Sequence, residues 1–554
     1  MITQLIADCL VAIELFVREN WAFVAVLVVA LIPWRIGASP VRAGSALLRT
    51  GGGAYPPRDW VAIAIVISVA LVWVGGGAYV HGVPLPQAAD DFSYLLAADM
   101  YSHGHLSYPA HPLWQHFETL HVLQTPRYAS QYQPAQGLAL ALGIIAFGIP
   151  LAGVWITVAL AVAAIWWALR VWTTPTLAFL GALAVATHRT MLIWGEVYHG
   201  GAIAAAAGAI MLAAAGKMIE RPTRRDFAII AAGAVILAFS RPYEGFVYSI
   251  AIGVILLIAA KWRDLIRTSS IAIVILITGA AGILGFNHAI TGDAFLMPHA
   301  LHDQRYIPAP NFVWEKPKPF PHYDNLEAET TFRIGYWDFY KHEHEPGGMR
   351  AELGKKLAVI GWAITGAPAN DAANASWLLM FVPLVALIPL LHEDRKARLL
   401  FIALLIFAFA PFSINWWMQL HYLAPGTALA VVLVAMLLAR LWTMKRGAFV
   451  TCVIVLLFVS GSIASWVRFV KTPDAGFEPQ RQRIARSILA HGGKHLVIVS
   501  PYVFGAIHNA GDIDASPIVW ARDRGDNSAL IRYFHDRKVW RLDKTGSTVF
   551  LRND

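Results

Sequence analysis

Long apolar runs recur along most of the chain and are separated by short stretches of polar and charged residues. A membrane-spanning helix needs about 20 predominantly apolar residues, or fewer where neighbouring helices cover its ends. Because lipid offers no partner to backbone polar groups, such runs predict helices. We therefore expect an all-α polytopic membrane protein with about twelve spans. The predicted spans are 20–34, 59–80, 150–171, 175–187, 199–216, 226–240, 245–260, 269–290, 376–391, 398–414, 423–441 and 448–467.

Three further apolar segments are shorter or are interrupted by polar residues: 1–18, 136–148 and 355–367. They fall short of the length that a full crossing requires. We expect them to form interfacial or re-entrant helices.

Basic residues are concentrated in alternate loops. The loop 81–134 contains only Arg127, and 413–422 contains no Lys or Arg. Cytoplasmic loops carry an excess of Lys and Arg, so the basic loops are predicted to be cytoplasmic. Basic loops and loops poor in basic residues alternate along the chain if the segment 136–148 does not cross the membrane. The basic loops contain Arg35, Arg42, Arg49, Arg58, Lys217, Arg221, Arg224, Arg225, Lys261, Arg263, Arg267, Arg395, Lys396, Arg398, Arg440, Lys445 and Arg446.

This topology divides the chain into a transmembrane part, 1–470, and a polar tail, 473–554. The transmembrane part carries two long external loops, 81–135 and 291–354. The tail alternates helical and strand patterns, which predicts a small α/β domain on the same external side. Its predicted elements are a helix at 479–490, strands at 496–500 and 517–521, a helix at 527–535, and strands at 539–543 and 548–552.

Composition agrees with this architecture. Hydrophobic residues make up 57% of the 554 residues and charged residues 14%, whereas soluble proteins carry about 25% charged residues. The net charge of +9 resides in short loops between apolar runs, so a nucleic-acid partner is not expected. The chain shows no internal repeat, which weighs against a transporter built from inverted halves.

Two adjacent carboxylates, Asp90 and Asp91, follow the span 59–80 by about ten residues. Like charges at a low-dielectric boundary repel, which suits a general base or a pair of metal ligands. The alternative is structural: Asp91 precedes a helical pattern and is well placed to be its N-cap.

Other ionisable residues near span ends have structural alternatives as well. Arg241 and Glu244 are spaced to pair with each other, and Arg305 in an external loop can simply be solvated. His421 fits either a ligand-binding or an interfacial residue. The histidines of the first external loop are dense, but their spacing matches no zinc template.

Several segments together resemble the GT-C superfamily of membrane glycosyltransferases. The acidic pair is followed by a loop end, Tyr128-Ala-Ser-Gln-Tyr-Gln-Pro-Ala-Gln-Gly137, and then by a lipid-plane helix. Further similar stretches are 191–199, 240–244, 287–293 and 419–425. The nearest relatives would be family 39 and family 83 enzymes, which include protein O-mannosyltransferases and lipid A aminoarabinose transferases. Where these enzymes often have Pro-Pro-Gly, this chain has Gln133-Pro-Ala-Gln-Gly137.

The resemblance implies transfer of a sugar, with inversion, from a polyprenyl-phosphate donor to a hydroxyl of a lipid, glycan or protein acceptor. It places the active site on the periplasmic side of a bacterial inner membrane, with Asp90 as the base. The departing phosphate would be stabilised by Arg241, by Arg305, or by a divalent metal ion on Asp90, Asp91 and Glu196. The second hypothesis is a transporter or flippase. The predicted catalytic residues are Asp90, Asp91 and Glu196, and the predicted substrate-binding residues are Tyr94, Tyr132, Gln133, Gln136, His199, Arg241, Glu244, His299, Arg305, Tyr306, His421 and Tyr422.

Overall fold

The computed structural model of the chain describes residues 59–86, 88–365, 383–415, 418–471, 478–543 and 548–551. Within these ranges, eight helices are long and apolar enough to cross a membrane. Each coincides with a span predicted from the sequence, which confirms the polytopic helical fold class. These helices are α4 (Asp59–His81), α7 (Pro150–Trp172), α10 (Ala202–Glu220), α12 (Pro242–Ala259), α14 (Ser270–Thr291), α20 (Arg395–Ser413), α21 (Thr427–Trp442) and α22 (Gly447–Lys471).

Three other predicted spans correspond to shorter helices: α8 (Pro175–Ala186), α11 (Arg224–Ala238) and α19 (Leu387–Glu393). With 12 residues, α8 rises only about 18 Å, less than the roughly 30 Å thickness of a hydrocarbon core. The chain breaks after it and continues as α9 (Arg189–Trp194). The predicted segments 1–18 and 20–34 lie outside the described residues, as do residues 376–382 of another span.

The helix predicted not to cross is α6 (Pro134–Phe147), whose 14 residues rise about 21 Å. It packs between α7 and the external helix α5 (Ala89–Ser102). A Cβ atom on Gly143 would lie 2.4 Å from the backbone nitrogen of Gly153 in α7, so only glycine permits this approach. The other short apolar segment falls mostly in α18 (Gly348–Thr365).

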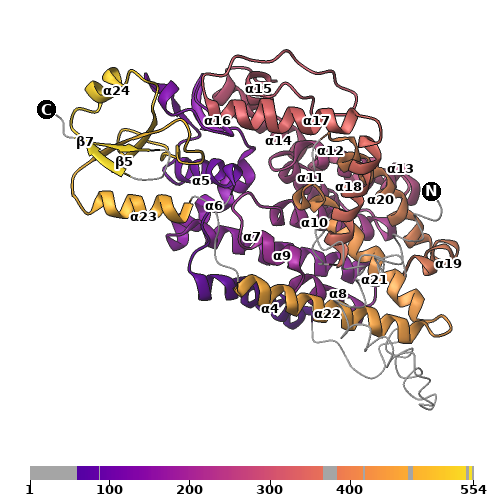
Figure 1. The fold of residues 1–554 in the computed structure, drawn as a ribbon. Coiled ribbons are helices and arrows are strands. Elements are labelled where there is room, and N and C mark those ends of the chain that lie inside the picture. The colour runs from indigo at the N-terminus through magenta and orange to yellow at the C-terminus, as the bar shows by residue number, and fades with distance from the viewer. Residues whose placement is uncertain are drawn as a thin grey trace.

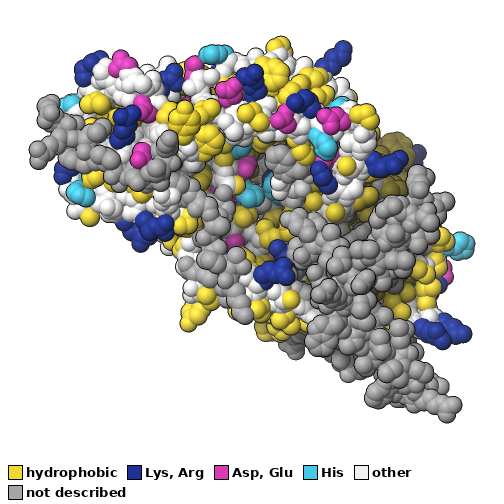
Figure 2. Space-filling view, in the orientation of Figure 1, with side chains coloured by type: hydrophobic (Ala, Val, Ile, Leu, Met, Phe, Trp, Pro, Cys, Tyr) yellow, Lys and Arg dark blue, Asp and Glu magenta, His cyan; other side chains and the backbone are white. Residues whose placement is uncertain are grey.

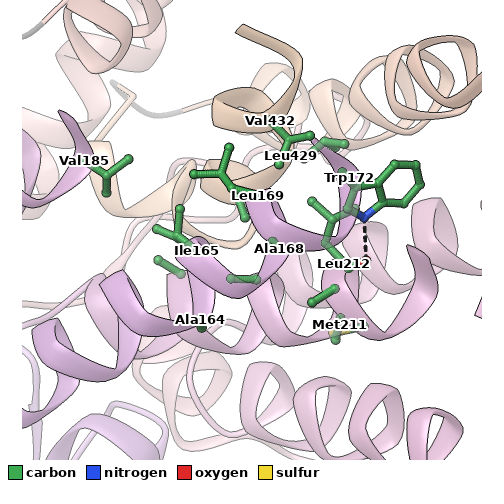
Figure 3. Close-up of a cluster of buried hydrophobic side chains, with 14 of the residues drawn as sticks. Ala164, Ile165, Ala168, Leu169, Trp172, Val185, Met211, Leu212, Leu429 and Val432 are labelled. Carbon is green, nitrogen blue, oxygen red and sulfur yellow. Dashed lines mark hydrogen bonds between the residues drawn. The ribbon is translucent and has the colours of Figure 1, made fainter. Parts of the chain in front are cut away.

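The centre of the helical part is the contact between α7 and α10, where small side chains let the two backbones approach closely (Figure 3). A Cβ atom on Gly208 of α10 would lie 2.0 Å from the carbonyl oxygen of Pro425, at the start of α21. The indole nitrogen of Trp172 donates to the carbonyl of Leu212 at 2.9 Å, so its buried polar group is satisfied. This packing fixes the helix ends that carry the polar residues described below.

The basic loops gather at one end of the helices. Lys396 pairs with Glu220 at 3.6 Å, and Arg440 pairs with Glu393 at 2.7 Å, which joins the ends of α10, α19, α20 and α21. Arg170 lies 3.3 Å from Asp59, which joins the end of α7 to the start of α4. The opposite helix ends carry both long loops and the tail.

The two long loops, whose external location stays a prediction, form a layer beyond those opposite ends, which we name the external layer (Figure 1). In the first loop, β1 (Tyr108–Pro109), β3 (Arg127–Ser130) and β2 (Val122–Leu123) form an antiparallel sheet in that order. The second loop contains α15 (Pro298–Tyr306), α16 (Leu326–Ala328), a π-helical segment (Glu329–Tyr336) and α17 (Trp337–His344). A short helix, α13 (Trp262–Thr268), lies in a basic loop instead.

The tail forms all six elements predicted for it, each shifted by at most two residues at its described ends. They are α23 (Glu478–Leu489), β4 (His495–Val499), β5 (Ile518–Arg522), α24 (Ser528–Tyr533), β6 (Lys538–Leu542) and β7 (Thr548–Leu551). The sheet order is β5-β4-β6-β7, with β4 parallel to β5 and β6, and β7 antiparallel to β6.

The tail shares one hydrophobic core with the first external loop. The two lie side by side in Figure 1. A buried ion pair between Arg522 of β5 and Glu327 of α16, 2.7 Å long, also ties the tail to the second loop. Both side chains are almost fully excluded from solvent. The shared core contains Leu96, Met100, Phe117, Val122 and Tyr128 from the loop and Leu496, Ile498, Ile513, Val519, Ala521, Leu530, Phe534 and Val539 from the tail.

Candidate active site

The acidic pair lies in the first turn of α5. The helix begins at Ala89, so Asp91 is its third residue rather than the N-cap predicted from the sequence. The Asp91 carboxylate nevertheless accepts a hydrogen bond from the backbone N–H of Ala88, at 3.3 Å. It therefore satisfies an unpaired donor at the helix start from within the helix, which is what a carboxylate at this position can do.

Asp91 has a second, long-range task. Its Oδ1 atom accepts hydrogen bonds from the backbone nitrogens of Tyr198, at 2.8 Å, and His199, at 3.0 Å. It also accepts one from Nδ1 of the His199 ring, at 2.8 Å. The side chain is only 1% exposed. Although burial opposes the charged imidazole, the hydrogen bond and the charge of Asp91 raise the pKa of His199 above its usual value. Asp91 thus holds the 195–200 loop against α5.

Asp90 is only partly buried and accepts a hydrogen bond from the hydroxyl of Tyr132 through Oδ1. The Tyr132 ring stacks on Tyr94, with centroids 4.5 Å apart. Burial favours the neutral acid, but His121, the Tyr132 hydroxyl, His199 and Arg241 outweigh it and lower the pKa of Asp90. Asp90 is therefore ionised at neutral pH. Its Oδ2 atom accepts no hydrogen bond from any residue that the structure describes.

Arg241 immediately precedes α12 and supplies the positive charge of the site. Its guanidinium lies over the ring of Tyr422, 5.6 Å from the centroid. Among the described residues, Arg241 forms no ion pair within 4.0 Å, so the predicted pairing with Glu244 is not formed as a direct contact. Glu244, in the first turn of α12, is buried and acts on Arg241 over a longer distance.

Histidines surround this acidic and basic pair. The His421 ring meets the edge of His199, with centroids 5.3 Å apart. Burial and the charges of Arg241 and His199 hold the pKa of His421 well below its usual value, so this ring is neutral. Asp303 raises the pKa of His299 against the effect of burial. The charge of Arg241 opposes this shift and that of Asp90 adds to it.

The sequence did not single out Asp303, His302 or His121, yet all three lie in this cluster. Asp303 binds Nδ1 of His299 at 3.1 Å and accepts from the side-chain amide of Asn311 at 2.6 Å. Burial lowers the pKa of His302 to about 4, so it is a neutral ring between Tyr306 and His121. Asp303 could have been identified in the sequence as a partner of His299, because their i, i+4 spacing places both on one helix face.

Three other predicted residues support the site or lie beside it. The amide of Gln136 donates to the carbonyl of Tyr198 at 2.9 Å and so ties α6 to the 195–200 loop. Gln133 is the N-cap residue of α6 and is buried. Glu196 points towards α4, where a Cβ atom on Gly77 would lie 2.9 Å from its Oε1.

Arg305 and Tyr306 lie elsewhere. Both line a separate cavity of about 180 Å³ in the external layer, together with Glu118, Asn325 and Arg524. Arg305 donates to the carbonyl and the hydroxyl of Thr125, the latter at 2.9 Å. The structure therefore does not bring Arg305 to Asp90, and its predicted role in stabilising a phosphate beside Asp90 is not supported.

The predicted metal-ligand set, Asp90, Asp91 and Glu196, is not assembled. In the part of the chain that the structure describes, no three His, Cys, Asp or Glu side chains are arranged to hold a metal ion. The physical reason is that Asp91 is occupied by three hydrogen bonds from the 195–200 loop and Glu196 turns towards α4.

The space-filling view shows a recess near the middle of one face, in which histidine and acidic side chains are visible (Figure 2). Polar side chains thus reach solvent between the helical part and the external layer. The site residues come from the external ends of α10, α12 and α21 and from α5, α6 and α15. Within the described residues, the arrangement combines an ionised carboxylate whose Oδ2 accepts no hydrogen bond with an arginine that has no direct ion pair. Of the imidazoles, His302 and His421 are neutral, whereas His199 and His299 have a raised pKa.

No protein-family model matches this chain, and no curated protein matches it in sequence. The fold is similar to that of the Archaeoglobus fulgidus oligosaccharyltransferase tethered to an acceptor peptide (11% identity, TM-score 0.49, 80% of this chain and 62% of that one). It is also similar to AglB from Archaeoglobus fulgidus with an inhibitory peptide and a dolichol-phosphate (10% identity, TM-score 0.47, 89% of this chain and 74% of that one). A third similar structure is ArnT from Cupriavidus metallidurans in the apo state (11% identity, TM-score 0.46, 88% of this chain and 93% of that one).

Each of these similarities concerns the fold alone. This chain spans 62% of the length of the first structure, which is less than two thirds. With an identity of 10–11% and such TM-scores, no residue role carries over to this chain.

Proposed function

We propose that this chain is a membrane glycosyltransferase that takes a sugar from a polyprenyl-phosphate donor and transfers it to an acceptor hydroxyl, with inversion. The observation that carries the proposal is that the ionised Asp90 carboxylate and the Arg241 guanidinium act on each other electrostatically, without a direct ion pair, at one end of the membrane-spanning helices. A donor with a polyprenyl tail remains in the bilayer, so its phosphate is held at this depth. Burying ionisable residues is costly, and such groups cluster at functional sites.

The residues divide the chemistry between them. The free Oδ2 of Asp90 takes the proton of the acceptor hydroxyl as that oxygen forms a bond to the anomeric carbon. The bond between this carbon and the phosphate oxygen breaks on the opposite face, and its electron pair leaves with the lipid phosphate. The negative charge that develops there is stabilised by Arg241, which forms no direct ion pair with a described residue.

The transporter hypothesis is less well supported by the placement of the polar groups. A transporter site lies near mid-membrane between repeated halves. Here Asp90, His199, Arg241 and Tyr422 lie at or beyond helix ends, on one side of the bundle.

The test uses purified protein and a polyprenyl-phosphate donor with a labelled sugar. We expect loss of the donor, release of the lipid phosphate, and appearance of label on an acceptor hydroxyl with inverted anomeric configuration. Movement of a substrate across liposomes, with every such donor left intact, would favour the transporter instead.

We further propose that the basic helix ends face the cytoplasm and the site faces the periplasm of a bacterial inner membrane. Tyr502 is 70% exposed in the tail, so a cysteine introduced there is accessible. It is expected to react with an impermeant maleimide once the outer membrane is opened, while the inner membrane is intact. Reaction only after the inner membrane is permeabilised would reverse the orientation.

A further inference from the structure

A second site lies in the external layer, away from Asp90. It is the cavity of about 180 Å³ at the junction of the first loop, the second loop and the tail. Trp114 and Glu118 come from the first loop, Arg305 and Asn325 from the second, and Arg524 from the tail. No side chain of this cavity has a role in the proposed transfer step.

The size and lining of the cavity restrict its ligand. Pockets for drug-sized ligands measure about 300–1,000 Å³, so this one suits a single small ring. Its lining is rich in planar polar side chains, with the aromatic rings of Trp114, Tyr306 and Tyr323 among them. A polyprenyl tail or an apolar peptide side chain would leave those polar groups without partners, which is costly. A sugar ring offers hydroxyls to the polar groups and C–H faces to the rings.

The arginines add a preference for negative charge. Arg305 uses one terminal nitrogen to bind Thr125, and its other two nitrogens make no hydrogen bond to the described residues. Among the described acidic residues, the Arg524 side chain lies within 4.0 Å of Asp324 alone, at 3.8 Å, and Asp324 also binds His322 at 3.1 Å. Glu118 is engaged by the hydroxyl of Tyr306, at 2.6 Å. Each of these two acidic side chains thus has a partner among the lining residues, and the guanidinium nitrogens that make no hydrogen bond to described residues are available to a planar anionic group.

We propose that this cavity binds one sugar unit that carries an anionic group, such as the carboxylate of a uronic acid. The ring of His302 lies between this cavity and the Asp90 site. Its centroid is 4.8 Å from that of Tyr306, which lines the cavity, and 5.7 Å from that of His121, which acts on Asp90. The cavity would hold an anionic unit of a glycan acceptor, and this assignment to the acceptor rests on the proposed function.

Binding is measured by calorimetry on the purified full chain, with no donor present, using methyl β-D-glucuronide, methyl β-D-glucoside and acetate. We expect the glucuronide to bind at least about tenfold more tightly than the other two. Arg524→Gln should weaken glucuronide binding at least about fivefold, because an arginine–carboxylate contact is lost. The matched control is Arg333→Gln, which removes an exposed arginine that pairs with Glu329 outside the cavity.

Each outcome decides one part. Equal affinity for the glucuronide and the glucoside would contradict the proposed preference for an anionic group. Equal affinity for the glucuronide and acetate would contradict the proposed recognition of a sugar ring. Glucuronide binding that Arg524→Gln leaves unchanged would overturn this location, as would no binding of any probe at all. Because no donor is present, these results do not depend on whether the chain transfers sugars.

Discussion

Replacing Asp90 by Asn is expected to lower sugar transfer at least about a hundredfold while the protein stays folded, since a positioned base contributes about 10²–10⁴-fold. Asn keeps the size of the side chain and still accepts the hydrogen bond from Tyr132. It cannot accept the proton of the acceptor hydroxyl at neutral pH. The measurement is turnover of the labelled donor by purified variants of matched thermal stability.

Asp91→Asn is the informative comparison. The Asp91 carboxylate accepts hydrogen bonds at both oxygens, so an Asn amide must turn its NH₂ group towards another donor. Leaving such a buried group unpaired costs about 1–3 kcal/mol. We expect this variant to lose stability in thermal unfolding more than it loses turnover per folded molecule. An Asp90→Asn enzyme with full activity would exclude Asp90 as the base.

A Tyr132→Phe variant tests the same assignment through pH. The Tyr132 hydroxyl helps to lower the pKa of Asp90 against the effect of burial, so its removal should raise that pKa. The base must be ionised, and kcat/KM falls as pH falls through its pKa. The acid limb of the profile should therefore move to higher pH in the variant. If the acid limb stayed at the same pH in the variant, the ionisation of Asp90 would not be the one that this limb reports.

Replacing Arg241 by Gln is expected to lower turnover by about 10²–10³-fold, which is the usual loss when one donor to a developing negative charge is removed. Arg241→Lys should lie between this variant and the wild type. Lysine keeps the charge, but it replaces a planar fork with a point charge. The expected signature is a fall in both kcat and kcat/KM, because the charge on the phosphate oxygen develops in the transition state.

Arg333→Lys is the matched control, because Arg333 is an exposed arginine in the external layer that pairs with Glu329. It should leave turnover unchanged. If Arg241→Gln retained wild-type kinetics, stabilisation of the phosphate would have to come from elsewhere, and the electrostatic interaction of Arg241 with Asp90 would no longer support the proposed function.

Local signals in the sequence predicted the elements well. Apolar runs of sufficient length gave the eight long helices, and alternation gave the strands of the tail. What the sequence could not provide was contact between distant segments. The hydrogen bonds between Asp91 and the 195–200 loop join residues 107 and 108 positions apart, and nothing local to either segment encodes them.

Arg305 shows how a closer use of helical geometry improves such predictions. Successive residues of a helix are about 100° apart, so Asp303 lies near His299 around the axis of α15, whereas Arg305 lies on another face. The sequence therefore contained a reason to separate Arg305 from His299. The N-cap prediction for Asp91 failed by three positions, because the N-cap residue is Ala88 and Asp91 is the third residue of the helix.

The core shared by the tail and the first external loop has a consequence for biosynthesis. Roughly 370 residues separate Tyr128 from Leu496, which meet in that core. At about 5–20 residues per second, the loop would wait some 20–70 s after its own synthesis for the strands that cover it. During that interval Met100, Phe117 and their neighbours are not covered by the tail. Glu327 likewise lacks its ion-pair partner until Arg522 has been synthesised. A nascent chain stopped just before Glu478 would contain every span described here and still present this apolar surface to chaperones and proteases outside the membrane.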